Sequence, residues 1–317
     1  MRSIYFHRLL IHVLAFVAAQ ATAAVPSAPK LPADAYFLMD ATTGQVLVDH
    51  NGDLSLPPAS LTKIMTSYVL AEEVDAGRAS LDDMIKVSRN AWSQNPTFKG
   101  SSLMWIEPGK PVSLADLERG VVISSGNDAS VAVAEHLTGT ESSFVDVMNQ
   151  LAAELGLDNT VYRNPHGLPH PEHRSTARDL AILSVALING HPEHYKIYKE
   201  QSFTYNGIKQ YNRNSLLRSD ATVDGLKTGY TNEAGYGLVA SAQREDMRLI
   251  SVVLGSASKR ARASESSRLL NYGFRFYQNL RPLSAEVTLV EPRVWKGAAE
   301  SLHAGVLESV VLTVPRE

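Results

Sequence analysis

The stretch PPASLTK at residues 57–63 constrains this chain more than any other. Proline fixes φ and lacks an N–H, so the two prolines predict an extended segment and a helix that begins after them. The apolar run that follows predicts a buried helix ending near Asp75. Ser60 and Lys63 then share one helix face, with the Lys63 amine beside the Ser60 hydroxyl. A hydroxyl, an amine and the free N–H groups of a helix start are the components of an acyl-transfer site.

The Ser-x-x-Lys pattern is short and occurs a second time, at residues 256–259, where we expect a turn after a strand. About one chance match is expected in a chain of this length. A plain N-terminal helix cap is the simpler interpretation of Ser60. The choice between the two therefore depends on the remaining motifs.

Length and composition limit the classes of function. A chain of 317 residues predicts two structural units, and 44% hydrophobic residues are enough for a substantial core. The formal net charge of -3, without a basic stripe interleaved with aromatic residues, gives no argument for nucleic-acid binding. The sequence contains no cysteine, which excludes disulfides, thiol catalysis and cysteine–metal sites.

Residues 1–23 have the pattern of a secretory signal peptide: a positive start, a short apolar run and a small-x-small site at residues 21–23. An uncleaved membrane anchor is the alternative. Residues 24–32 form a linker rich in proline, alanine and serine. Because an exported chain without cysteine suits a bacterial periplasm, we expect that location.

The order of patterns predicts an α+β fold: a mixed antiparallel sheet with flanking helices and a helical lobe. The N-terminal hairpin should supply one edge of the sheet. The expected strands span residues 36–40, 45–49, 203–205, 208–211, 223–230, 236–242 and 247–254. One expected helix begins at residue 113, and the others span residues 129–137, 144–155, 176–188 and 259–278.

These elements predict a catalytic domain over residues 33–281. The pattern changes at residue 282, where short alternating segments begin. We expect residues 282–317 to be the start of a small β-rich C-terminal domain. Its predicted strands span residues 287–290, 293–295 and 310–314.

Two further motifs follow Ser60 and Lys63. Ser125-Gly126-Asn127 is expected on a tight loop between helices, and Lys227-Thr228-Gly229 on a strand. The three motifs in this order, each in a fitting context, are the signature of penicillin-binding proteins and class A β-lactamases.

Longer segments strengthen this resemblance. Residues 58–67, 98–104, 125–129 and 223–229 resemble the D-alanyl-D-alanine carboxypeptidases of the penicillin-binding protein 5 type, peptidase family S11. The similarity runs from about residue 33 to 316. It implies a transpeptidase-like catalytic domain followed by a small β domain, and a role in peptidoglycan biosynthesis. Such proteins usually end in an amphipathic helix that attaches to the inner membrane, and the printed residues stop within the expected β domain.

The resemblance implies a role for each motif residue. Ser60 would attack the carbonyl of the penultimate D-Ala to form an acyl-enzyme. Lys63 would be the base, with a pKa lowered by burial and by the charge of Lys227. Ser125 would pass a proton to the departing D-Ala amine, and Asn127 would hold Lys63 and a substrate carbonyl.

The resemblance also implies a substrate-binding edge. The oxyanion hole would consist of the backbone N–H groups of Ser60 and Tyr230. A cationic clamp would bind the terminal carboxylate, with Arg262 as first choice and Arg260 as second. Tyr230 stands where the family often has histidine. The expected substrate-binding residues are Thr228, Gly229, Tyr230 and Arg262.

The expected partners are peptidoglycan stem peptides, with β-lactam antibiotics as covalent inhibitors, and no cofactor is expected. The sequence does not decide whether the protein associates with the inner membrane. His166, His170 and His173 lie in a proline-rich loop without helical spacing, so a metal site is not expected there. His166 could line the cleft.

Alternative functions differ in the groups that they require. A class A β-lactamase needs a glutamate that activates the deacylating water. Glu154 is expected on a helix and Glu172 lacks a downstream asparagine, so we expect β-lactams to remain bound to Ser60. A D,D-endopeptidase is a nearer alternative, a non-catalytic peptidoglycan-binding protein is a more distant one, and a metallohydrolase is the most distant.

Overall fold

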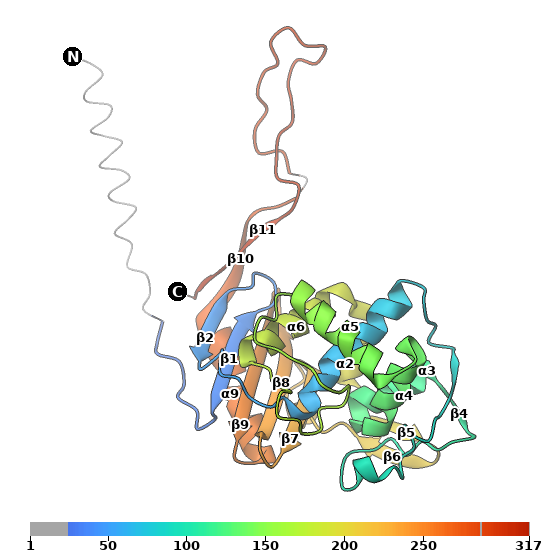
Figure 1. Ribbon diagram of the computed structural model, residues 1–317. Helices are drawn as coiled ribbons and strands as arrows, with labels where there is room; N and C mark the ends of the chain where they lie inside the picture. Colours follow the sequence, from blue (N-terminus) through green and yellow to red (C-terminus); the bar gives the residue numbers. More distant parts are fainter. Residues whose placement is uncertain (1–24, 286, 317) are drawn as a thin grey trace, which may run out of the picture. The chain divides into compact units, whose positions relative to one another are not determined.

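The computed structural model describes residues 25–285 and 287–316 (Figure 1). The expected signal peptide, residues 1–23, lies outside the described residues. The described part of the chain divides into two compact units: one is Pro29–Phe274, and the other comprises residues 25–28, 275–285 and 287–316. The expected boundary between a catalytic and a C-terminal domain at residues 281 and 282 stays a prediction.

A five-stranded antiparallel sheet forms the centre of the larger unit, which confirms the α+β fold class. Its N-terminal hairpin supplies one edge, as predicted, and the strand with the Lys-Thr-Gly motif is the other edge. The strands lie in the order β2 (Val46–His50), β1 (Ala35–Asp40), β9 (Met247–Ser256), β8 (Gly235–Arg244) and β7 (Val223–Thr231).

The sheet is buried on both faces because each face is covered by helices. Side chains alternate along β1, which has an apolar residue at nearly every position. Phe37 joins the main core, and α6 (Ala177–Gly190) packs on β1 and β9. Leu38 faces α9 (Lys259–Phe276) so closely that a Cβ on Gly273 would lie 3.0 Å from it.

The predicted helical middle of the chain forms a lobe beside the sheet (Figure 1). Its apolar side chains join the same core as the sheet. One helix begins earlier than predicted because the Thr140 side chain caps it. The lobe contains α2 (Lys63–Asp75), α3 (Leu114–Arg119), α4 (Asn127–Thr138) and α5 (Glu141–Glu154).

Shorter elements connect the lobe and the sheet. The predicted hairpin around Asn206-Gly207 is confirmed. No helix in the two described ranges is long and apolar enough to cross a bilayer. The remaining elements are η1 (Ala59–Thr62), β3 (Met84–Lys86), η2 (Pro96–Phe98), β4 (Pro111–Ser113), η3 (Gly120–Ser124), α7 (Pro192–Tyr195), η4 (Lys196–Lys199), β5 (Ser202–Tyr205), β6 (Ile208–Tyr211) and α8 (Leu216–Ser219).

The smaller unit agrees with the prediction only at its last strand, which was expected over residues 310–314. The helix expected to reach residue 278 ends at Phe276, and β10 (Tyr277–Leu283) follows and pairs with β11 (Val310–Pro315). The strands predicted at residues 287–290 and 293–295 are wrong: these segments form only isolated bridges. Their apolar side chains, including Val287, Val290 and Trp295, are exposed. Alternating polarity predicted strands there, but a strand needs a face to bury.

Candidate active site

Ser60 lies in η1, the turn that leads directly into α2. The turn is closed by the Leu61 N–H donating to the Pro58 carbonyl at 3.1 Å and by the Thr62 hydroxyl donating to the Ala59 carbonyl at 2.8 Å. Thr62, not Ser60, is the residue before α2, and neither side chain caps the helix. The simpler interpretation of Ser60 as a helix cap is therefore wrong.

Lys63 is completely buried beneath this turn, with 0% of its surface exposed. Its Nζ atom lies 3.3 Å from the Ser60 hydroxyl oxygen. It also donates to Asn127 Oδ1 at 2.7 Å and to the His166 carbonyl oxygen at 2.6 Å. The Asn127 and His166 oxygens hold the amine against the Ser60 hydroxyl, as the predicted pairing of Ser60 with Lys63 requires.

A second hydroxyl–amine pair lies beside the first. Ser125 has a left-handed backbone conformation, with φ of 58°, between η3 and α4, which confirms the predicted tight loop. Lys227, on edge strand β7, donates to the Ser125 hydroxyl at 2.9 Å and to the Thr228 carbonyl at 3.2 Å. Two amines from different elements, α2 and β7, thus lie beside two serine hydroxyls of the site.

Burial controls the charge on these amines. It lowers the pKa of Lys63 well below the usual value for lysine; the nearby charge of Arg213 lowers it further, while Asp128 opposes this. Burial likewise lowers the pKa of Lys227, together with the charges of Lys63, Arg213 and Arg262. The charge that lowers the Lys63 pKa was predicted to be that of Lys227, but it is that of Arg213; between the two lysines, the charge of Lys63 lowers the pKa of Lys227.

Arg262 projects from α9 onto the same strand and is 5% exposed. Its Nη1 donates to the Gly229 carbonyl at 2.9 Å and to the Gly237 carbonyl at 3.2 Å. Burial, with the charge of Arg213, lowers the pKa of Arg262 to about 10. Arg260, the second choice for the clamp, is exposed and lines a different cavity. Of the two arginines, only Arg262 faces the site.

These groups surround one cavity of about 480 Å³. Ser60, Ser125, Asn127 and the substrate-binding residues predicted from the sequence all lie on its wall. The described lining residues include no carboxylate, so the cavity is positively charged and rich in hydroxyl groups, which suits an anionic ligand. The lining is Ser60, Gly100, Ser101, Ser102, Ser125, Asn127, His166, Gly167, Leu168, Arg213, Thr228, Gly229, Tyr230, Thr231, Tyr236, Lys259 and Arg262.

Two glycines allow the backbone to close around Ser60. Gly229 on β7 lies against η1, where a Cβ would meet the Pro58 carbonyl oxygen at 3.0 Å. Gly167 has φ of 83°, and a Cβ there would lie 1.8 Å from the Ala59 carbonyl oxygen. The Ser60 turn is therefore held between β7 and the segment that contains His166.

The second Ser-x-x-Lys match does not pair its serine with its lysine, although Lys259 lines the same cavity. Ser256 is buried and its hydroxyl donates to Glu265, while Lys259 is exposed. Only the first match pairs its serine with its lysine at the cavity.

The histidines of the proline-rich loop have separate contacts. His166 lines the cavity, whereas His173 Nε2 lies 2.9 Å from the Thr62 hydroxyl. His170 accepts from the Glu172 N–H through Nδ1. Within the described part of the chain, no group of three or more histidine or carboxylate side chains could hold a metal ion.

Neither glutamate considered for a β-lactamase lines the cavity. Glu154 accepts from Gln150 on the surface of α5, and Glu172 pairs with Arg163. The sequence-based reasoning missed Arg213, which lines the cavity and donates to the Ser102 hydroxyl. No motif marks Arg213, because it lies just after the β5–β6 hairpin.

The chain is similar to known proteins over most of its length. The model of the D-alanyl-D-alanine carboxypeptidase family, peptidase S11, matches residues 21–258. D-alanyl-D-alanine carboxypeptidase DacC of Escherichia coli (strain K12) is 50% identical over 291 residues, which are 91% of this chain and 73% of DacC.

Solved structures are similar as well. Penicillin binding protein 5 from Haemophilus influenzae has a TM-score of 0.86 at 43% identity, over 92% of this chain and 84% of that chain. Penicillin-binding protein D2 from Listeria monocytogenes, in its ampicillin-bound form, has a TM-score of 0.69 at 32% identity, over 78% of this chain and 99% of that chain.

Proposed function

Because the chain belongs to the D-alanyl-D-alanine carboxypeptidase family, we propose that it removes the terminal D-Ala from peptidoglycan stem pentapeptides through an acyl-enzyme at Ser60. The observation that carries this proposal is the Lys63 amine, buried and 3.3 Å from the Ser60 hydroxyl on the wall of a cationic cavity.

In the acylation step, Ser60 Oγ attacks the carbonyl carbon of the penultimate D-Ala and Lys63 accepts the hydroxyl proton. A lysine can act as a base near neutral pH only when its pKa is lowered. Burial and the charge of Arg213 supply that change in pKa. The backbone N–H groups of Ser60 and Tyr230 would stabilise the oxyanion.

As the tetrahedral intermediate collapses, the C–N bond breaks and the leaving D-Ala amine needs a proton. Ser125 is suited to pass it on, because its hydroxyl accepts from Lys227 at 2.9 Å. Asn127 holds Lys63 through Oδ1 and leaves its NH₂ group for a substrate carbonyl. Water then releases the shortened peptide from Ser60.

The free terminal carboxylate of the substrate would bind at the cationic end of the cavity. Arg262, Thr228 and Arg213 line that region. Arg262 donates through Nη1 to two backbone carbonyls, which fixes the guanidinium plane against β7. The carboxylate at the C-terminus of a peptide would fit this cationic region. The carboxylate of a β-lactam resembles it, so we infer that β-lactams acylate Ser60 as well.

The proposal includes a location for the enzyme. Residues 1–23 would direct export to the bacterial periplasm, residues 33–281 would carry the catalysis, and the protein would associate with the inner membrane. A D,D-endopeptidase would use the same cavity on cross-linked peptides. A β-lactamase is less favoured, because the described lining residues include no carboxylate to activate water.

Release of D-Ala from a synthetic pentapeptide tests the proposal. The mature chain should release one D-Ala per peptide, and Ser60→Ala should abolish release. The peptide with an amidated C-terminus should react at least about tenfold more slowly, because it lacks the charge that the cavity binds. Equal rates on both peptides, or activity in the Ser60→Ala variant, would contradict the assignment.

A further inference from the structure

His166 contacts the site through its backbone and its ring, and the two contacts differ. The backbone carbonyl accepts from Lys63 Nζ at 2.6 Å. The ring Nδ1 accepts from the Leu168 N–H at 3.1 Å, which closes a tight turn over Gly167. The side chain is 7% exposed, so the ring is fixed between the cavity and the lobe.

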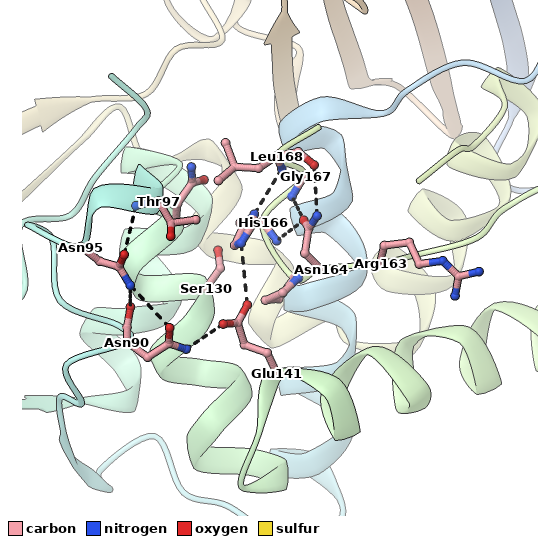
Figure 2. A network of polar contacts seen from close by, with 12 residues as sticks. Asn90, Asn95, Thr97, Ser130, Glu141, Arg163, Asn164, His166, Gly167 and Leu168 are labelled. Carbon is pink, nitrogen blue, oxygen red and sulfur yellow. Dashed lines mark hydrogen bonds and ion pairs between the residues drawn. The ribbon is translucent and has the colours of Figure 1, made fainter. Parts of the chain in front are cut away.

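The ring must be neutral, with its proton on Nε2. An Nδ1 atom that accepts a hydrogen bond carries no proton, so the single ring proton of neutral imidazole is on the other nitrogen. Burial, followed by the charges of Lys63 and His173, lowers the pKa of His166 well below its usual value. The Nε2 atom lies on the side of the ring that faces α5 (Figure 2).

Glu141, the first residue of α5, receives the Nε2–H group (Figure 2). Its Oε2 lies 3.7 Å from His166 Nε2, which is longer than a hydrogen bond, so the attraction is that of an N–H dipole for a carboxylate. Its Oε1 accepts from Asn90 Nδ2 at 2.7 Å, and the same Asn90 amide donates to Glu135 at 3.1 Å. The two carboxylate oxygens of Glu141 thus face two donors.

We propose that Glu141 is a positioning residue that holds the His166 ring in its Nε2–H tautomer and so keeps the His166 carbonyl under the Lys63 amine. The inference rests on the proposed function, since it concerns the base of that reaction. Glu141 does not line the cavity and acts only through His166.

The surroundings of Glu141 make its charged form less favourable than it is in water. Burial raises the pKa of Glu141, the charge of Glu135 raises it further, and the bond from Asn90 opposes this. A carboxyl whose pKa is higher in the folded than in the unfolded state favours folding only when protonated, and that contribution is lost as pH rises through the folded pKa. At neutral pH, therefore, neutral glutamine at position 141 should not lower the melting temperature.

Glutamine is also the sharpest test of the geometry, because it has the same shape as glutamate but one acceptor oxygen for two donors. The matched control is Glu135→Gln, which changes a carboxylate that contacts the same Asn90 amide and not His166. The experiment measures the second-order rate of acylation by a fluorescent penicillin as a function of pH, with the melting temperature of each variant. Glu141→Ala is the larger change.

The plateau of the pH profile is the acylation rate constant at the pH values where it no longer changes with pH. We expect Glu141→Gln to lower this plateau roughly tenfold, and Glu141→Ala to lower it further, because the base is misplaced. Loss of the His166 acceptor disfavours the Lys63 ammonium form, so the ascending limb of the pH profile should move to lower pH. Glu135→Gln should change neither.

The proposal would be overturned if both Glu141 variants had the same plateau rate constant and the same ascending limb as the wild-type chain. The proposal would also be overturned if the plateau rate constant fell in parallel with the melting temperature while the ascending limb of the pH profile did not move. That pattern would indicate a general packing defect. If the wild-type chain itself is not acylated, the proposed function fails, and this inference with it.

Discussion

At the scale of single residues, the site depends on keeping amines neutral. Lys63 and Lys227 are both buried, and each lies near other cations. Transfer of a lysine out of water favours its neutral form, and a neighbouring positive charge adds to that effect. The structure assigns much of that added charge to Arg213, which lowers the pKa values of both lysines.

Arg213→Gln should therefore slow acylation in a pH-dependent way. Removal of this charge lets the pKa of Lys63 rise, so less of the amine is neutral at pH 7 and the acylation rate falls several-fold there. The ascending limb of the rate–pH profile should move to higher pH, opposite to the shift expected for Glu141→Gln. Arg218→Gln is the control, since Arg218 is exposed and does not line the cavity. An unmoved limb in Arg213→Gln would contradict the role given to Arg213.

The sequence predicted some of these residues and not others. Ser60, Lys63, Ser125, Asn127 and Lys227 lie in three short motifs, and the structure brings them together. Arg213 and Glu141 lie in no motif. Arg213 reaches the cavity from a loop, whereas Glu141, at a helix start, does not line the cavity and contacts the ring of His166 on its wall. Only the tertiary fold determines which side chains from such segments meet.

At the scale of elements, the position of Ser60 depends on two backbone contacts. The η1 turn packs against Gly229 of β7 on one side and Gly167 on the other, and neither position has room for a side chain. The positive φ of Gly167 adds a second restriction, because residues other than glycine rarely adopt it.

Gly167→Ala should destabilise the chain by roughly 3 kcal/mol or more and impair acylation, because the new methyl group clashes with the Ala59 carbonyl in a strained conformation. Gly190→Ala is the control: a Cβ at Gly190 meets nothing within 4 Å. Chemical denaturation compares the two variants. A Gly167→Ala protein as stable as Gly190→Ala would show that the close approach is not needed.

Periodicity predicted most elements of the larger unit, but in the smaller unit it predicted only the last strand, β11, correctly. The sheet strands have long apolar stretches that are buried on both sides, so their pattern and environment agree. The alternation of apolar and polar residues at 287–295 also predicted strands. A sequence pattern, however, does not reveal whether there is a surface for the apolar side chains to pack against. In the structure those apolar side chains are exposed.

At the scale of the whole molecule, the fold brings distant segments to one cavity. Ser60 comes from a turn before the lobe, Ser125 from a loop inside it, and Lys227 from the edge of the sheet. An antiparallel sheet with its last motif on an edge strand leaves that strand free to face the lobe. The motif order indicated this arrangement only through resemblance, because nothing in the spacing alone predicts contact between β7 and η1.

The most direct test of Ser60 as the nucleophile is the mass of the peptide that carries a labelled penicillin after incubation with the mature chain. We expect one slowly released adduct on the peptide containing Ser60, absent in Ser60→Ala and retained in Ser256→Ala, where the other Ser-x-x-Lys serine is changed. An adduct on a different residue would contradict the assignment of Ser60. Rapid turnover without an adduct would instead identify a β-lactamase.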